Sequence, residues 1–89
     1  MTTMFVRHTV ADYATWRKAY DGFASVQKAK GVVGQAVYQA IDNPNDITVT
    51  HEFASAKAAQ AFVDSDELKQ AMQNAGVTGA PTIWFTNKK

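Results

Sequence analysis

Residues 42–53 read DNPNDITVTHEF, and this stretch decides how the chain folds. Its first half concentrates Asp, Asn and Pro, the residue types that favour a tight turn. From Ile47 to Phe53, apolar residues and His51 alternate with threonines and one glutamate, which is the period-two pattern of a strand with two distinct faces. A strand that follows such a turn folds back on the preceding one. The stretch therefore predicts an antiparallel hairpin, with residues 32–41 as its first strand.

The residues before this hairpin predict a strand followed by a helix. Residues 4–10 form a short β-type run, and Asp12 follows as a residue whose carboxylate can cap the first turn of a helix. Gly31 is expected to end that helix. Along it, large side chains recur at the spacing of one helix face, at Trp16, Tyr20 and Phe23, with Gln27 or Val26 next.

The residues after the hairpin repeat this order. Ser55 is expected to cap a helix, and Ser65 to cap its continuation after a break at residues 64–67. A loop at residues 77–81 then precedes a last strand at residues 82–86. Two βαβ units with a hairpin between them predict an α+β protein with the ferredoxin-like βαββαβ fold and a four-stranded antiparallel sheet. Right-handed crossovers place the first and third strands together at its centre.

Length and composition predict one domain over residues 1–89 and exclude several classes of protein. Nine Lys and Arg against eight Asp and Glu leave a net charge of +1 without a basic cluster, so no nucleic-acid partner is expected. The chain has no cysteine, which excludes disulfides, thiolate catalysis and iron–sulfur clusters. No apolar stretch approaches the ~20 residues of a membrane span, and the N-terminal residues do not resemble a signal peptide. We therefore expect a cytoplasmic protein without a membrane partner.

Both faces of the predicted sheet carry large apolar side chains, as in Phe5 beside Val6 and in the run 83–85, Ile-Trp-Phe. Two short helices can cover only one face. A second copy of the chain is the simplest cover for the other, so the sequence predicts a homodimer. Arg7 and Glu52 share the uncovered face and are expected to form an ion pair there.

His8 and His51 are the candidate catalytic residues. They lie on the two strands expected to be neighbours, and each shares its side of the strand with apolar residues. If the register allows, both imidazoles enter one half-buried space beside the aromatic stripe of the first helix. A histidine in an apolar pocket suits general acid or base chemistry near neutral pH. The alternative is a pair of structural histidines in the core.

Trp16, Tyr20 and Phe23 are the candidate ligand-binding residues. Their spacing is that of any helix that buries one face, so core packing explains it equally well. They could also form an aromatic wall for a flat apolar ligand, with the Tyr20 hydroxyl as a polar contact. No metal site is expected, because Asp12 and Glu52 are the only acids near the two histidines in the predicted fold and Glu52 points to the opposite face from His51.

Three segments carry a resemblance to a known group of proteins: residues 10–13 (VADY) with Trp16, residues 50–53 (THEF), and residues 81–85 (PTIWF). In these the chain resembles the dimeric α+β barrel superfamily, and within it the branch of antibiotic-biosynthesis monooxygenase-like and polyketide cyclase-like proteins. The resemblance implies a homodimer whose two sheets pack into a barrel, with a small cavity in each subunit between sheet and helices. Oxygenases of the group typically use an Asn, a Trp and a Tyr or His near that cavity. Trp16 and Tyr20 lie on the first predicted helix, whereas no Asn occurs on the first strand, the first helix or the central third strand.

The resemblance favours a cofactor-free monooxygenase-like or cyclase/isomerase-like enzyme that acts on a small aromatic or polyketide-like molecule. In that role His51 and His8 are the acid/base pair, while Trp16 and Tyr20 shape the pocket. Similar proteins also include stress-response proteins and many of unknown role, and fold alone does not choose among them. A non-catalytic dimer that binds a small ligand, or serves in a stress response, is therefore the alternative. A pure interaction module would lack a ligand-sized cavity.

Overall fold

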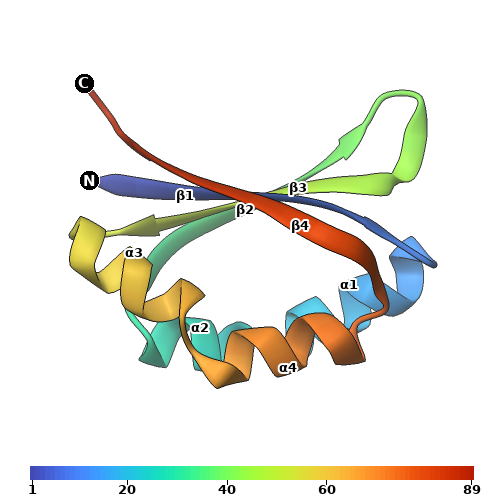
Figure 1. Cartoon of the computed structure of the whole chain (residues 1–89), viewed down its shortest axis with the longest axis horizontal. Coiled ribbons are helices and arrows are strands. Elements are labelled where there is room, and N and C mark those ends of the chain that lie inside the picture. The colour runs from blue at the N-terminus through green and yellow to red at the C-terminus, as the bar shows by residue number, and fades with distance from the viewer.

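A computed structural model describes all 89 residues as a four-stranded antiparallel sheet with its helices gathered on one face (Figure 1). This confirms the predicted ferredoxin-like α+β class. In chain order the elements are β1 (Thr2–Val10), α1 (Tyr13–Gly22), α2 (Ala24–Ala29), β2 (Val32–Ala40), β3 (Asn43–Phe53), α3 (Ala56–Val63), α4 (Asp66–Asn74) and β4 (Val77–Asn87). No helix is both long and apolar enough to cross a bilayer.

The strand order is β2-β3-β1-β4, so the first and third strands are central, as predicted. In the β1–β3 register, His8 lies opposite Ile47 and Met4 lies opposite His51. Side chains alternate between the faces of a strand, so all four residues share one face. All four are buried beneath the helices. The alternation predicted for β3 is therefore confirmed.

The core lies between the sheet and the helices and consists of two groups of buried side chains. One is built around Met4, Val6, Phe53, Ala59, Phe62 and Leu68. The other is built around Val10, Trp16, Ile47, Val49 and Ala75. The groups occupy the two ends of the layer, and the cavity described below lies where they meet, because members of both line it.

The first helical segment differs from the expected single helix, since it divides at Phe23 into α1 and α2. Gly22 is a weak helix former. Phe23 then has a ψ of −4°, away from the α-helical value of about −42°. Its ring lies 6.3 Å from that of Phe62 on α3, so the break accompanies packing of Phe23 into the core. The predicted caps are present, as Asp12 accepts a hydrogen bond from the Thr15 amide at 3.0 Å.

Two segments expected to be irregular are instead parts of strands. In the first hairpin only Ile41 and Asp42 remain outside the strands, and Ala40 pairs with Asn43. The expected loop at residues 77–81 pairs with β1 through Val10 and Val77. The pairing of β1 with β4 shifts register between Arg7 and Thr9, and near this shift Gly79 has a positive φ of 75°. Pro81 is tolerated because β4 is an edge strand.

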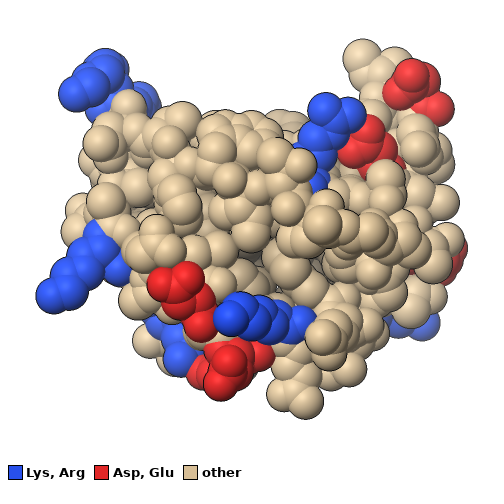
Figure 2. Space-filling view, viewed as in Figure 1, with Lys and Arg blue, Asp and Glu red and all other residues tan.

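The sheet face away from the helices carries no covering element (Figure 1). On it Phe5 and Trp84 stack with ring centroids 5.2 Å apart, and Trp84 remains 39% exposed. The expected Arg7–Glu52 ion pair is wrong. Arg7 instead pairs with Asp46, at 2.7 Å between Nη2 and Oδ2, because Arg7 lies opposite Thr48 whereas Glu52 lies opposite Thr3. Figure 2 shows basic and acidic side chains interspersed, with no basic cluster on the face in view.

Candidate functional site

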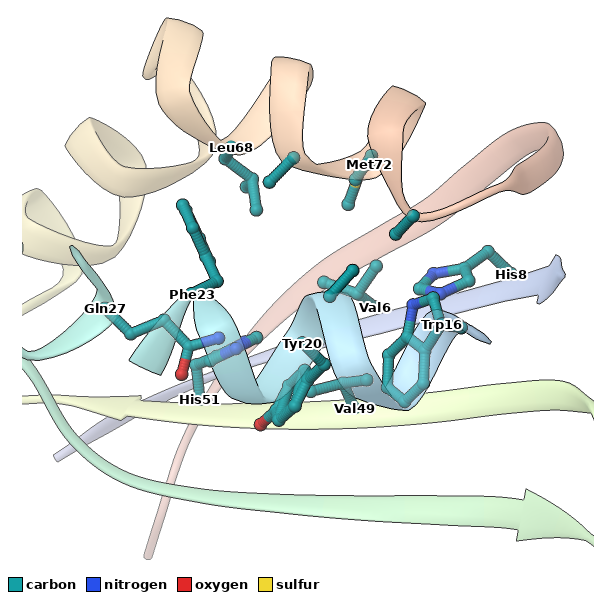
Figure 3. A pocket seen from close by; sticks show the side chains of 13 residues that line it. Val6, His8, Trp16, Tyr20, Phe23, Gln27, Val49, His51, Leu68 and Met72 are labelled. Atoms are coloured by element: carbon teal, nitrogen blue, oxygen red, sulfur yellow. The ribbon is translucent and has the colours of Figure 1, made fainter. Parts of the chain in front are cut away.

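A small cavity of about 50 Å³ lies between the sheet and helices α1, α2 and α4. All five residues proposed from the sequence line it: His8, His51, Trp16, Tyr20 and Phe23 (Figure 3). Most of the remaining lining is apolar, and Leu68 and Met72 of α4 contribute to it. The candidate site residues are thus brought together around one space.

The helical stripe supplies one wall of the cavity. Trp16 and Tyr20 stack with ring centroids 4.9 Å apart, and Phe23 and Gln27 extend the same line into α2. Gln27 rather than Val26 is the fully buried fourth member of this stripe. The aromatic residues therefore serve in core packing and in lining the cavity at once.

His8 and His51 line the same cavity without meeting each other. Their positions differ by four residues along the paired strands, with the Val6–Val49 pair between them. At a rise of about 3.3 Å per residue, this separation is roughly 13 Å along the sheet. Direct proton transfer between the two rings is therefore excluded in this arrangement, and each histidine faces a different end of the cavity (Figure 3).

His51 is held in an almost wholly apolar environment. It is 4% exposed, and its ring centroid lies 5.4 Å from Phe62 and 6.4 Å from Tyr20. Burial lowers the pKa of His51 to about 4. Neither ring nitrogen has a hydrogen-bond partner within the chain. At neutral pH the imidazole is therefore uncharged, with one N–H and one free lone pair facing its surroundings.

His8 occupies the other end, where its ring lies 5.8 Å from that of Trp16. Burial lowers the pKa of His8 as well, and the nearby charge of Asp46 opposes this effect. Both of its ring nitrogens are also buried without a partner. Buried polar groups in native proteins are nearly always hydrogen-bonded, so four such nitrogens in one cavity require an explanation.

The His51 end of the cavity carries further polar groups. Gln27 is 3% exposed, and its Oε1 has no hydrogen-bond partner. The Tyr20 hydroxyl donates to Gln35 Oε1 at 2.8 Å, and Gln35 is the β2 neighbour of His51. Burial raises the pKa of Tyr20, an effect that the charge of Arg17 and the Gln27 carboxamide oppose. These contacts place Gln27, Tyr20, Gln35 and His51 together, and we call this group the polar end.

Gln27 was not among the site residues proposed from the sequence. The sequence contained a pattern that could have indicated it, because Gln27 lies at i+4 from Phe23 and so continues the otherwise aromatic face of the helix. Spacing alone did not distinguish it from Val26 as the buried residue. No three His, Cys, Asp or Glu side chains lie close enough together to hold a metal ion.

The fold and the site define a class of small ferredoxin-like α+β proteins, in which an apolar cavity beneath the sheet contains a few unpaired polar groups. The sequence profile of the antibiotic biosynthesis monooxygenase family matches residues 4–74. The chain therefore belongs to that family. No curated protein sequence matches the chain.

Solved structures with the same fold include a Bordetella bronchiseptica protein provisionally named an antibiotic biosynthesis monooxygenase. It has a TM-score of 0.84 and 14% identity, over 99% of this chain and 96% of that one. SnoaB, a cofactor-independent oxygenase from Streptomyces nogalater, has a TM-score of 0.76 and 14% identity, over 99% and 94%. NE2512, a protein of unknown function from Nitrosomonas europaea, has a TM-score of 0.76 and 19% identity, over 96% and 85%. At these identities the likeness establishes the fold alone.

Proposed function

We propose that the protein is a cofactor-independent monooxygenase-like or cyclase-like enzyme that acts on a small aromatic or polyketide-like molecule. The observation that carries this proposal is the set of four buried histidine nitrogens without partners in one apolar cavity. Each buried polar group left unpaired costs about 1–3 kcal/mol. Such a cost is typical of a site whose polar groups serve a bound molecule rather than the stability of the fold.

His51 is the proposed base. Its neutral imidazole can accept a proton from an acidic C–H or O–H of a bound substrate, which leaves a carbanion, enolate or phenolate beside the new imidazolium. Such an electron-rich anion can itself reduce dioxygen. For an activated methylene the balanced reaction is CH₂ + O₂ → C=O + H₂O, in which one oxygen atom enters the product and the other leaves as water with the two protons. His8, at the other end, is proposed to contact a different part of the substrate.

The size of the cavity requires it to widen on binding. A volume of about 50 Å³ holds one or two water molecules, whereas benzene occupies cavities of about 150 Å³. Leu68 and Met72 line the cavity from α4, and methionine is the most adaptable of the large apolar side chains. We propose that movement of α4 away from α1 admits the substrate.

The active form is proposed to be a homodimer. The uncovered sheet face carries Phe5, Trp84 and Tyr38, of which Trp84 is 39% and Tyr38 57% exposed. A second sheet laid on this face would bury these aromatic side chains. This supports the barrel of two sheets expected from the sequence.

A non-catalytic ligand-binding dimer is the second candidate, and one observation favours it. A pKa of about 4 makes His51 a weak base, effective only toward a substrate that is itself acidic. A binding protein has no such requirement. It would show saturable uptake of a small aromatic compound without product.

Oxygen uptake separates the two candidates. The protein is incubated in air with a panel of phenols and of methylene compounds flanked by aromatic rings, and products are identified by mass spectrometry. A monooxygenase should consume one O₂ per product, whereas a cyclase should form product without O₂ uptake. In either case His51→Leu should lower the rate of product formation at least tenfold. Gln70→Ala, on the exposed surface of α4, is the matched control and should retain the wild-type rate. Equal rates in wild type and His51→Leu would refute catalysis by His51, and saturable binding without any product would favour the second candidate.

A further inference from the structure

Gln27 is the one buried polar side chain of the cavity with no part in the chemistry proposed above. It lies on α2 at 3% exposure, and its Oε1 is fully buried without a partner in the chain. Gln27 and His51 both line the cavity, and Figure 3 shows the Gln27 carboxamide beside the His51 ring. A carbonyl oxygen in that position can only accept a hydrogen bond. Any partner for it must therefore bring a donor.

The neighbours of Gln27 narrow the chemistry of such a partner. The Tyr20 hydroxyl already donates to Gln35 Oε1, so it is engaged. The uncharged imidazole of His51 presents one N–H donor and one acceptor nitrogen to the same end. The Gln27 carboxamide and the His51 imidazole together thus present both acceptors and donors, which matches a group that both gives and receives a hydrogen bond.

We infer that Gln27 is a specificity-determining residue that, with His51, recognises a neutral hydroxyl group on the ring of a bound aromatic substrate. The hydroxyl would donate to Gln27 Oε1 and accept from the His51 N–H. This inference rests on the proposed function, because it assumes that the cavity takes an aromatic molecule.

Other substituents fit the polar end less well. A carboxylate would place negative charge beside Gln27 Oε1, and no Lys or Arg lines the cavity to compensate. A methyl group would leave Oε1 and the His51 nitrogens unpaired. A site built to bind a hydroxyl discriminates strongly against a ligand that lacks this group, because the buried polar groups of the site then remain without hydrogen bonds.

Phenol and toluene test the inference, since they have the same shape and differ only in OH against CH₃. Dissociation constants for both are measured by NMR titration of wild type, Gln27→Met and Gln70→Met. Methionine matches the length of glutamine without the carbonyl, and Gln70 is an exposed glutamine on α4. Gln27→Met should bind phenol about tenfold more weakly and toluene equally well or better, while Gln70→Met should match wild type. A thermal melt of Gln27→Met confirms that the variant is folded, and Gln27→Leu serves as a second variant.

The outcomes distinguish this inference from the proposed function. If both compounds bind and Gln27→Met leaves the phenol-to-toluene ratio unchanged, Gln27 has no role in specificity while the aromatic cavity stands. If neither compound binds to wild type, the aromatic cavity itself is wrong, and the role of Gln27 falls with it. A selective loss of phenol binding in both Gln27 variants supports the inference.

Discussion

Replacing His51 by leucine is expected to stabilise the folded protein and to reduce its sensitivity to acid. The two side chains are similar in size, and leucine suits the apolar surroundings next to Phe62. At neutral pH the substitution removes a buried polar ring whose two nitrogens have no partner. Removing such a group in favour of an apolar one is expected to raise the free energy of unfolding by about 1–2 kcal/mol.

The acid dependence follows from the pKa of His51, which falls from 6.5 to about 4 on burial. Between these values the unfolded chain binds a proton that the folded protein does not. Stability is therefore complete above pH 6.5 and is lost as the pH falls toward 4. The linkage relation predicts a loss of about 2 kcal/mol at pH 5 from His51 alone. The lowered pKa of His8 contributes a further loss of the same sign.

Urea unfolding followed by circular dichroism at pH 7.5 and pH 5.0 measures this difference. Protein concentration is held constant, because dimerisation would add to the apparent stability. Between the two pH values, His51→Leu should lose about 2 kcal/mol less than wild type. Gln70→Leu, which is exposed, should show the wild-type loss. If His51→Leu and wild type lose the same free energy, then His51 is not buried in an uncharged form and the reasoning fails.

Three further substitutions test other parts of the structure. Trp84→Glu places a charge on the uncovered sheet face and should halve the molar mass seen by light scattering, since a dimer that buries this face would dissociate; an unchanged mass would place the interface elsewhere. Ser65→Ala removes a hydroxyl whose oxygen accepts from the Leu68 amide and whose O–H donates to the Phe62 carbonyl, and it should cost about 1 kcal/mol in urea unfolding; no loss would mean that this cap is dispensable. Met72→Ala enlarges the cavity and should tighten toluene binding in NMR titrations while lowering the melting temperature; weaker binding would argue against entry beside α4.

Much of the fold could be predicted because it is encoded by local patterns. The alternation of Ile47 to Phe53 identified β3 and its two faces, and the order of elements then placed β1 and β3 at the centre. The caps at Asp12, Ser55 and Ser65 are side-chain to backbone contacts within three residues, so they too are visible in the sequence. The segments for which the prediction was wrong depend on contacts with residues distant in the sequence. Residues 77–81 look like a loop in isolation, and they become a strand because β1 pairs with them.

The sequence is sufficient to predict which side chains lie beneath the sheet. The periodicity of strands and helices sets the face on which His8, His51 and the Trp16–Tyr20–Phe23 stripe lie. Only the tertiary structure decided how far apart they are. The antiparallel register places Val6 and Val49 between the histidines, and it gives Arg7 the partner Asp46 instead of Glu52. It also decided that Gln27 joins the cavity, since the break at Phe23 sets the direction of α2. Distances across a sheet and between layers depend on contacts between residues that are far apart in the sequence. Local periodicity of the sequence does not encode these contacts.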